Sequence, residues 1–547
     1  MSSSCTVSRR QFAQMAAVGG ASIALGSVIS GCTKSESTTS ASPDEPRDEV
    51  IIALSTTSEP AAGFDPFASW GCGEHCHEPL IQSTLVKTGA DMTIENDLAT
   101  DYSCSDDGLV WSFTIRTDVK FSDGEPLTAE DVAFTINGIR DAEGAEADFS
   151  MVDEAVALDD EHVEIRLLRP YNVLLYTLAV VGICPAHAHG ADYGEHPIGS
   201  GRYIMTQWDK GQQVIFEANP DYYGEAPLMK RVVVVFMDDD AALAATQSGD
   251  VDVAQTSAFL ADTAVEGYGL LDCKTVDCRG IALPVLPEGS TFKMDGEDVP
   301  SGNAITSDVY FRRAVNYAID RELLIKRALN GYAHPAFSVC DGMPWACEDM
   351  IIETDVEHAK ELLAEGGWKP GDDGILEKDG VRAEFKLYYM SNDTMRQSIG
   401  ADVAEQLAPL GIKVIVEGMG WEELIPISFT DLQVWGWGAN SPSEVYSINH
   451  TSGGANFASR SDVITDALLE DALAQKTLEE SYPLFRDAQF DGKNGVTPDA
   501  DAPWVWLCNV DHLFFTRDGL QVAEQKLHPH GHGWSLVNNV DRWSWAV

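Results

Sequence analysis

Basic residues are scarce in this chain of 547 residues. It holds 36 lysines and arginines against 87 aspartates and glutamates, which gives a formal net charge of −51 at pH 7. A surface this acidic repels the phosphate backbone of DNA or RNA, so we expect no nucleic-acid partner. The imbalance instead indicates a solvated surface in a compartment outside the cytosol.

The chain also lacks a long hydrophobic run. The apolar stretch from Ala13 to Ile29 is diluted by glycine and short for a membrane span, and no later segment reaches about 18 consecutive apolar residues. Before this stretch, Ser8-Arg9-Arg10-Gln11-Phe12 looks like a twin-arginine export signal. After it, Ile29-Ser30-Gly31-Cys32 resembles a bacterial lipobox. We therefore predict that residues 1–31 are a signal peptide, exported by the twin-arginine or the general route, and that Cys32 is lipidated.

A lipid on Cys32 would anchor the mature protein to the outside of a bacterial cell membrane without spanning it. Residues 32–49 are rich in Ser, Thr, Pro and acids, so we expect them to be a disordered tether. The folded part should begin at Val50-Ile51-Ile52-Ala53-Leu54, which has the composition of a buried strand. About 500 residues follow, enough for two or three domains.

Sequence motifs of common enzyme classes are missing as well. The chain has no G-x-S-x-G, no H-E-x-x-H, no G-x-x-x-x-G-K-[ST] and no strand-anchored G-x-G-x-x-G. We therefore expect no enzymatic activity and no cofactor. A secreted hydrolase remains a remote alternative.

Cysteine usage is ordinary, with 11 residues in the whole chain. Outside the cytosol, cysteines that are close in sequence tend to pair. We predict the local disulfides Cys273–Cys278 and Cys340–Cys347. Because the mature fold would hold an odd number of cysteines, at least one should remain free.

The densest group of metal-ligating residue types is "CGEHCHE" at residues 72–78. Cys72, His75, Cys76 and His77 offer thiolate and imidazole ligands to zinc or nickel. Their spacing matches no standard metal motif, so a Cys72–Cys76 disulfide and a ligand-facing loop without metal remain open.

Other histidines give weaker signals. His187 and His189 in "CPAHAHG" are a minor metal candidate, and His528, His530 and His532 alternate with Pro and Gly. We expect the last three to lie in a surface loop.

Residues 106–135 show clear local structure. Trp111, Phe113 and Ile115 alternate with polar residues, which predicts a half-buried strand. A turn follows, and then Thr128 with Asp131 predicts an acidic variant of the capping box at a helix start.

This segment, "DDGLVWSFTIRTDVKFSDGEPLTAEDVAFT", closely resembles the signature of family 5 solute-binding proteins, the peptide- and nickel-binding receptors of ABC importers. The resemblance continues in "PIGSGRYIMTQWDKGQQVIFEANPDYYGEAP", although Arg202 stands where Pro is usual. It continues further in "RRAVNYAIDRELLIKRALNGYAHPA" and "AKELLAEGGW", and covers most of residues 50–440.

The resemblance implies an α/β fold of the periplasmic-binding-protein type, with two lobes and mixed sheets flanked by helices. Lobe I would comprise residues 50–80, 198–290 and 508–547, with a subdomain inserted at 81–197. Lobe II would comprise residues 291–507.

Local signals agree with this α/β alternation. Asp320 and Asp355 have the positions of helix N-caps, and Asn330-Gly331 and Gly366-Gly367 those of helix ends. The other predicted elements are a helix over 394–410 and strands over 232–237, 385–390 and 412–416.

The same resemblance implies a ligand site in the stretch "WGWGANSPSEVYSINH" at residues 435–450. In peptide-binding relatives this region pairs with the backbone of an extended peptide. We expect Gly436 and Gly438 to let a ligand approach the main chain, and Trp435 or Trp437 to form a wall while the other faces the core. The loop "SEPAAGFDPF" at 58–67, with Phe64 and Asp65, should lie on the opposite side of the cleft.

The residue at position 440 departs from the family pattern. Peptide-binding relatives usually carry an aspartate there for the peptide ammonium, whereas this chain has the neutral Asn440. Glu444 is the nearest replacement. In the nickel-binding branch a histidine follows this run after a few residues; here Glu444 falls near that place and His450 lies further along, with Cys72, His75, Cys76 and His77 as further weak metal candidates.

The expected function is thus that of a monomeric receptor. It would capture a peptide or peptide-like solute between two lobes and deliver it to an ABC permease with its ATPase subunits. The alternative is a receptor for nickel or a metal chelate.

Overall fold

The computed structural model describes residues 47–68, 78–142, 145, 147–294, 296–438, 440–531 and 533–546. The predicted signal peptide, Cys32, the tether before Arg47, Cys72, His75, Cys76 and His77 therefore lie outside the described residues, as does His532. Within the described ranges, no helix is long and apolar enough to cross a membrane.

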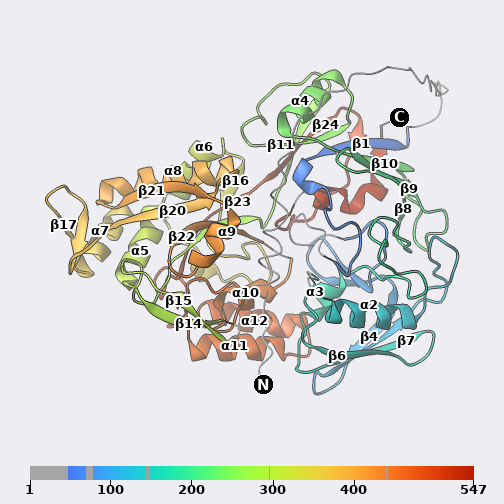
Figure 1. Cartoon of the computed structure of the whole chain (residues 1–547), viewed down its shortest axis with the longest axis horizontal. Helices are drawn as coiled ribbons and strands as arrows, with labels where there is room; N and C mark the ends of the chain where they lie inside the picture. The colour runs from blue at the N-terminus through green and yellow to red at the C-terminus, as the bar shows by residue number, and fades with distance from the viewer. Residues whose placement is uncertain are drawn as a thin grey trace.

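Lobe I is built on a seven-stranded mixed sheet (Figure 1). Its strands are β1 (Glu49–Leu54), β8 (Tyr203–Asp209), β9 (Gln213–Ala218), β10 (Arg231–Phe236), β11 (Val253–Thr256), β12 (Tyr268–Cys273) and β24 (His512–Arg517). They lie in the order β12-β24-β11-β1-β10-β9-β8, and only β1 with β10 and β1 with β11 are parallel pairs. Apolar side chains cover both faces, against η5 (Trp534–Arg542) on one side and α4 (Asp239–Ser248) on the other.

A smaller antiparallel sheet forms the inserted subdomain, at the lower right of Figure 1. Its strands are β4 (Ala99–Cys104), β5 (Val110–Ile115), β6 (Val152–Ala157) and β7 (His162–Leu167), and it is accompanied by the pair β2 (Val86–Thr88) and β3 (Ile94–Asn96). Two helices complete the subdomain: α2 (Ala129–Asp141) packs on β6 and β7, and α3 (Leu174–Leu178) lies beside β2.

Lobe II is built on a six-stranded mixed sheet in the order β16-β23-β13-β22-β20-β21. The strands are β13 (Cys278–Ala282), β16 (Ala333–Pro335), β20 (Glu384–Met390), β21 (Lys413–Met419), β22 (Leu432–Trp437) and β23 (Trp504–Val510). β20 is parallel to both β21 and β22, so the carboxyl ends of these three strands meet at one edge. This edge positions the candidate site.

Helices cover both faces of the lobe II sheet. One face packs on α5 (Val309–Ala318), α6 (Arg321–Ala328), α7 (Val356–Glu365) and α8 (Thr394–Leu407). The other face packs on α10 (Ser443–Asn449), α11 (Val463–Leu473) and α12 (Leu478–Gln489). Smaller elements are α9 (Trp421–Leu424), β14 (Ser290–Met294), β15 (Glu297–Ser301), β17 (Lys369–Pro370), β18 (Leu376–Lys378), β19 (Val381–Arg382), β25 (Leu520–Gln521) and β26 (Ser544–Trp545).

The chain crosses between the two large sheets at two points. Residues 274–277 join β12 to β13, and Asp511 joins β23 to β24. The segment 525–531 runs alongside, because the amide of Val276 donates to the carbonyl of His528 at 2.9 Å. We call residues 274–277, Asp511 and residues 525–531 the hinge.

The two crossings differ from those that the sequence indicated, the first lying earlier in the chain and the second later. Residues 278–290 were expected in lobe I, but Cys278–Ala282 form β13 in the middle of the lobe II sheet. Residues 508–510 likewise end β23 of lobe II. Local sequence predicts a strand, but the sheet that a strand joins depends on distant partners.

The lobes meet again far from the hinge. The amide of Asn172, just before α3, donates to the carbonyl of Leu473 at 3.0 Å, and the hydroxyls of Tyr176 and Tyr482 lie 2.8 Å apart. We call Asn172, Tyr176, Leu473 and Tyr482 the latch. The structure therefore shows the lobes in contact at the latch as well as at the hinge.

Neither predicted disulfide is present. The seven described cysteines, which include Cys273, Cys278, Cys340 and Cys347, are all free. Cys273 and Cys278 belong to strands of different sheets. Five residues of extended chain span roughly 16 Å, whereas a disulfide needs Cα atoms within about 7 Å.

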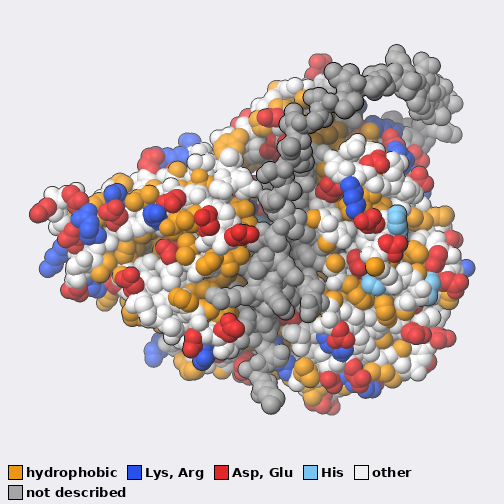
Figure 2. Space-filling model, viewed as in Figure 1, with side chains coloured by type: hydrophobic (Ala, Val, Ile, Leu, Met, Phe, Trp, Pro, Cys, Tyr) orange, Lys and Arg blue, Asp and Glu red, His pale blue; other side chains and the backbone are white. Residues whose placement is uncertain are grey.

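Most predicted elements form where the sequence placed them. Asp320 caps α6 through the amide of Leu323, and Asp355 caps α7 through that of His358, each at 2.9 Å. Asp131 accepts the amide of Thr128 at 2.9 Å, as the capping-box interpretation required. Figure 2 shows acidic side chains spread over both lobes on the visible face, with basic ones between them.

Candidate functional site

Strand β22, with which the stretch singled out in the sequence begins, ends beside the hinge. β22 pairs with β13 so that Trp437 lies opposite Cys278, the first residue after the crossing from lobe I. On its other side, the registered pairs with β20 are only those of Leu432 and Gln433. Among the described strands, the last part of β22 thus has one edge that no neighbour pairs.

Both tryptophans of β22 point to the same face. Their ring centroids lie 6.1 Å apart, and both contact Phe457, at 4.4 Å for Trp435 and 6.0 Å for Trp437. The argument that the two side chains alternate was wrong, because residues i and i+2 of a strand share a face; whether Trp437 forms a wall for a ligand stays a prediction. Trp435 is buried at 3% exposure, and Trp437 is only partly buried.

At Gly436 and Gly438 a side chain would collide with other atoms of the protein. A Cβ on Gly436 would lie 2.6 Å from an Nη of Arg396 and 3.0 Å from one of Arg279. Gly438 has a φ of +145°, and a Cβ there would lie 2.2 Å from the carbonyl oxygen of Val276. Gly436 therefore admits two guanidinium groups, and Gly438 admits the hinge backbone.

Arg279 and Arg396 are the strongest charges at this edge. Arg279 is the second residue of β13 and pairs with Asp277, and its side chain is 6% exposed. Arg396 sits in the first turn of α8, just beyond the carboxyl end of β20, where one Nη donates to Asp393 at 2.8 Å. Burial, and then the charge of Arg279, lower the pKa of the Arg396 guanidinium. Two like charges held this close favour anions beside them, and Asp277 and Asp393 supply two.

Arg396 has an N–H donor that is not used in a hydrogen bond within the described chain. Its Nε has no hydrogen-bond partner among the described residues, and neither has the Nε of Arg279. A guanidinium carries five N–H donors in a planar fork that fits a carboxylate. The pair can therefore receive a carboxylate without breaking its contacts to Asp277 and Asp393.

Asp277 links this pair to the hinge. Besides Arg279, it lies 2.5 Å from Nδ1 of His530 and 3.3 Å from Nε2 of His512. Burial alone would raise the pKa of Asp277, but Arg279 and His530 hold it well below its usual range. His528 also lies here at 1% exposure, so this residue of the predicted surface loop is in fact buried in the hinge, and His530 is partly buried.

Three further polar groups near the end of β22 lack protein partners within the described chain. They are Nε1 of Trp437, Oδ1 of Asn440 and Nδ2 of Asn509. Asn509 lies two strands from Trp437, because both residues pair with Cys278 of the strand between them. Buried polar atoms without partners are uncommon in proteins. They are available for hydrogen bonds with a ligand.

Glu444 is buried at 9% exposure in the first turn of α10. Its carboxylate accepts the amide of Gly438 at 3.2 Å. It therefore lies beside the candidate site and also fixes the turn that follows β22.

The loop of residues 58–67 behaves differently from expectation. Phe64 is 1% exposed and packs edge-on against Trp208, Phe216 and Trp534 in the core of lobe I, so it is a core residue. Asp65 lies 3.0 Å from Nε2 of His189 in the inserted subdomain. Neither residue is brought to the end of β22 by any contact described here.

His450 belongs to helix packing. Its ring stacks on Tyr446 at 4.3 Å, and Nε2 faces Asp466 and Glu470 of α11 at 3.8 and 3.5 Å. The weak metal prediction for His450 therefore finds no support, because its ring is engaged with α11. The other weak candidates, at 72–77, lie outside the described residues.

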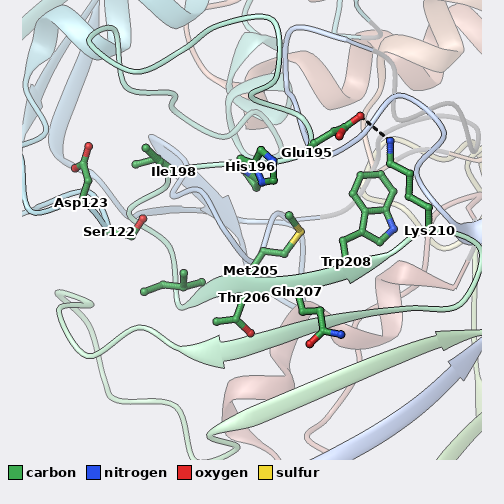
Figure 3. A pocket seen from close by; sticks show the side chains of 12 residues that line it. Ser122, Asp123, Glu195, His196, Ile198, Met205, Thr206, Gln207, Trp208 and Lys210 are labelled. Atoms are coloured by element: carbon green, nitrogen blue, oxygen red, sulfur yellow. Dashed lines mark hydrogen bonds and ion pairs between the residues drawn. The ribbon is translucent and has the colours of Figure 1, made fainter.

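A separate depression of about 370 Å³ lies on lobe I along β8 (Figure 3). Its one ion pair, Glu195 with Lys210, is more than half exposed on both sides. None of the predicted site residues lines it. The charged, partly unsatisfied edge at β22 is the better candidate.

The two arginines were missed in the sequence. Arg279 interrupts the apolar strand "CRGIA", and a charge within a buried strand is itself a signal of a paired or functional group. Arg396 looks like an ordinary residue in the first turn of a helix. Only the fold brings the two within reach of Gly436.

Known proteins resemble this chain over most of its length. Protein XP55 of Streptomyces lividans is 30% identical over 496 residues, which cover 87% of this chain and 86% of that protein. The oligopeptide-binding protein AppA of Bacillus subtilis is 29% identical, with 82% and 84% covered. The structure of NikZ from Campylobacter jejuni with Ni(L-His) is 27% identical, covers 91% of this chain and 100% of that chain, and superposes with a TM-score of 0.73.

A structure of NikA from Brucella suis with Fe(III)-EDTA is 21% identical and shares the fold, with a TM-score of 0.76 and coverage of 90% and 99%. Residues 93–459 match the family described as bacterial extracellular solute-binding proteins, family 5, middle part. Two lobes, a hinge and a charged strand edge between them fit this match. The chain belongs to family 5 of the bacterial extracellular solute-binding proteins.

Proposed function

We propose that this receptor captures a short peptide or peptide-like solute that carries a free carboxylate. The observation that carries the proposal is the pair Arg279 and Arg396 beside Gly436, at the carboxyl edge of the parallel strands β20, β21 and β22. In open α/β sheets, ligands bind outside the carboxyl ends of the strands. The carboxylate meets Arg396, and the ligand backbone pairs with the free edge of β22.

The end of the ligand opposite the carboxylate meets the polar groups after β22. Asn440 offers an amide oxygen and Trp437 an indole N–H, and both lack partners in the described structure. Asn440 carries no charge, so a ligand ammonium gains less here than beside an aspartate. Main-chain pairing does not depend on side-chain identity, so the binding mode tolerates varied residues.

A metal chelate is the second candidate. The similarity to NikZ with Ni(L-His) favours it, and a chelate of amino acids also presents carboxylates to arginine. A bare divalent cation fits poorly, because two guanidinium groups at the edge repel it.

Calorimetry on refolded, ligand-stripped protein tests the proposal. We would titrate dipeptides to pentapeptides, the same peptides with an amidated C-terminus, and nickel with free histidine. We expect the free acids to bind and the amides to bind more weakly. Tight nickel–histidine binding without a peptide response would replace peptide by chelate.

Variants then locate the site. Arg396→Gln should weaken binding of the free acid by roughly 30-fold, equivalent to about 2 kcal/mol, and leave the amide unchanged. Arg382→Gln, in the exposed β18–β19 hairpin, is the matched control and should have no effect. Trp437→Ala should weaken free acid and amide alike, and Asn440→Asp should favour free-amine over N-acetylated peptides.

The receptor is further proposed to be a lipid-anchored monomer that hands its ligand to an ABC permease. The support is the lipobox-like sequence Ile29-Ser30-Gly31-Cys32. Cys32→Ala should move the protein from the membrane fraction to the soluble fraction. Retention in the membrane fraction would contradict the lipid anchor and leave the ligand proposal untouched.

A further inference from the structure

Three metal-ligating side chains converge where lobe I meets the inserted subdomain. A carboxylate oxygen of Asp65, Sγ of Cys184 and a ring nitrogen of His189 all lie within 4.8 Å of one another. The group comes from two segments more than a hundred residues apart in sequence. Among the described residues it is the one such group of three or more ligand types.

The three ligand atoms lie near the separations that one shared ion requires. Nε2 of His189 lies 3.0 and 3.1 Å from the two carboxylate oxygens of Asp65. Typical Zn–N, Zn–O and Zn–S lengths place ligand atoms about 3.3 to 3.6 Å apart. Because the three atoms lie within 4.8 Å of one another, shifts of roughly 1.2 Å or less bring them onto one ion.

Both segments are also held in place by hydrogen bonds of their backbone, which involve none of the three ligand atoms. The backbone amide of Cys184 donates to Oγ1 of Thr135 on α2 at 2.9 Å. The amide of Phe64, next to Asp65, donates to the carbonyl of Gly194 at 2.8 Å. Preorganised ligands lower the cost of assembling a metal site.

The surroundings favour a divalent cation with an affinity for sulfur. Cys184 is fully buried at 0% exposure, and the side chains of Asp65 and His189 are 15% and 14% exposed. Rings of Phe67 and Tyr193 pack on His189 at 4.1 and 4.8 Å. One thiolate and one carboxylate supply two negative charges to a divalent cation, and a thiolate ligand selects against Mg²⁺ and Ca²⁺.

We propose that Asp65, Cys184 and His189 bind Zn²⁺ or a similar thiolate-binding divalent cation, which clasps the loop of residues 59–68 to the segment of residues 182–194. The site has three protein ligands and leaves a fourth position for solvent. Its role is structural, because it ties a lobe I loop to the inserted subdomain. It is independent of the ligand site at β22.

The first test is metal content and ligand type in the wild-type full-length protein, purified with a tag that contains no histidine. We expect close to one zinc per chain by mass spectrometry. After chelation and reloading with Co²⁺, we expect near-ultraviolet absorption from a thiolate–cobalt bond. X-ray absorption of the zinc form should show one sulfur near about 2.3 Å. A shell without sulfur, or no stoichiometric metal, would overturn the proposal.

Variants separate this site from the other candidate ligands. Cys184→Ser should abolish the thiolate–cobalt absorption, and His189→Gln should lower zinc affinity at least about 10-fold. His187→Gln, a half-exposed neighbour paired with Asp123, is the matched control and should bind normally.

A variant with Cys72, His75, Cys76 and His77 all replaced by serine or glutamine should keep its metal. If this variant loses the metal while Cys184→Ser retains it, the proposal is wrong. Circular dichroism of each metal-free variant distinguishes a lost ligand from a lost fold, and the X-ray absorption result stands without any variant.

Discussion

The hinge and the latch both join the lobes, but they do so with different chemistry. The hinge holds buried charges: Asp277 faces Arg279, His512 and His530. The latch uses neutral groups, a hydrogen bond from Asn172 to a carbonyl and the contact of Tyr176 with Tyr482. Breaking the hinge would strand charges in a dry interior, whereas the latch groups can exchange their partners for water.

This difference suggests which contact changes when a ligand enters. Residues 274–277 and Asp511 are continuous chain, so the lobes stay joined there. We expect the lobes to move apart at the latch, whose polar groups are neutral, while Asp277 stays covered. The following predictions test this division of roles.

The largest effect is expected at the hinge carboxylate. Asp277→Asn leaves Arg279 buried without a counter-charge and should lower the free energy of unfolding by about 3 to 5 kcal/mol. Urea unfolding measures it, with the exposed Asp372→Asn as a control that should change little. A loss as small as that of the control would mean that the hinge charges are well solvated.

The next effect is a pH dependence at His528. Burial, and then the charges of His512 and Lys526, hold the pKa of His528 well below its ordinary value. Below about pH 6.5 the unfolded chain therefore binds a proton that the folded hinge does not. Stability should fall by up to about 1.4 kcal/mol per pH unit as the pH drops below this value.

His528→Gln should flatten this slope in urea unfolding curves recorded between pH 7 and pH 5. The variant His358→Gln, at a half-exposed position on α7, should keep it. An unchanged slope in His528→Gln would show that another group causes the acid sensitivity.

A smaller effect is expected at the latch. Tyr482→Phe removes the hydroxyl contact with Tyr176. It should reduce the free energy that favours the closed arrangement of the lobes by about 1 kcal/mol. Small-angle scattering of the ligand-free protein should show a more open particle, and ligand affinity should fall a few-fold. Tyr317→Phe, whose hydroxyl bonds Asp499 inside lobe II, should leave scattering and affinity as they are.

The smallest effect concerns a second contact beside the latch. Lys476 and Asp106 lie 2.7 Å apart, but their side chains are 62% and 100% exposed. Solvent and salt screen such a pair, so Lys476→Gln should change neither opening nor affinity measurably. An effect equal to that of Tyr482→Phe would show that electrostatics hold the latch.

Sequence reasoning worked where structure is local. The N-caps Asp320 and Asp355 and the alternation around Trp111 depend on neighbours within a few residues, and each formed as predicted. A family resemblance supplied the two-lobed fold. The local predictions and the family resemblance both depend on short segments whose residues can be interpreted without knowing their distant contacts.

Sequence reasoning failed where segments that are distant in the chain meet. The hinge collects Asp277, His512 and His530, which no local pattern joins, so the histidines near the C-terminus were predicted to be exposed. Gly436 was predicted to admit a ligand, but the atoms that lie beside it belong to Arg279 and Arg396. Which atoms fill the space beside a glycine is a property of the fold.

The position of β24 has a consequence in time. This strand, His512–Arg517, lies between β12 and β11, near one end of the chain but inside the lobe I sheet. A ribosome therefore releases all of lobe II before it releases the strand that joins β12 to the rest of lobe I. Lobe II is one uninterrupted stretch and can fold first, while lobe I waits for its late strand. During synthesis, the molecule is for a while a finished half attached to an unfinished one.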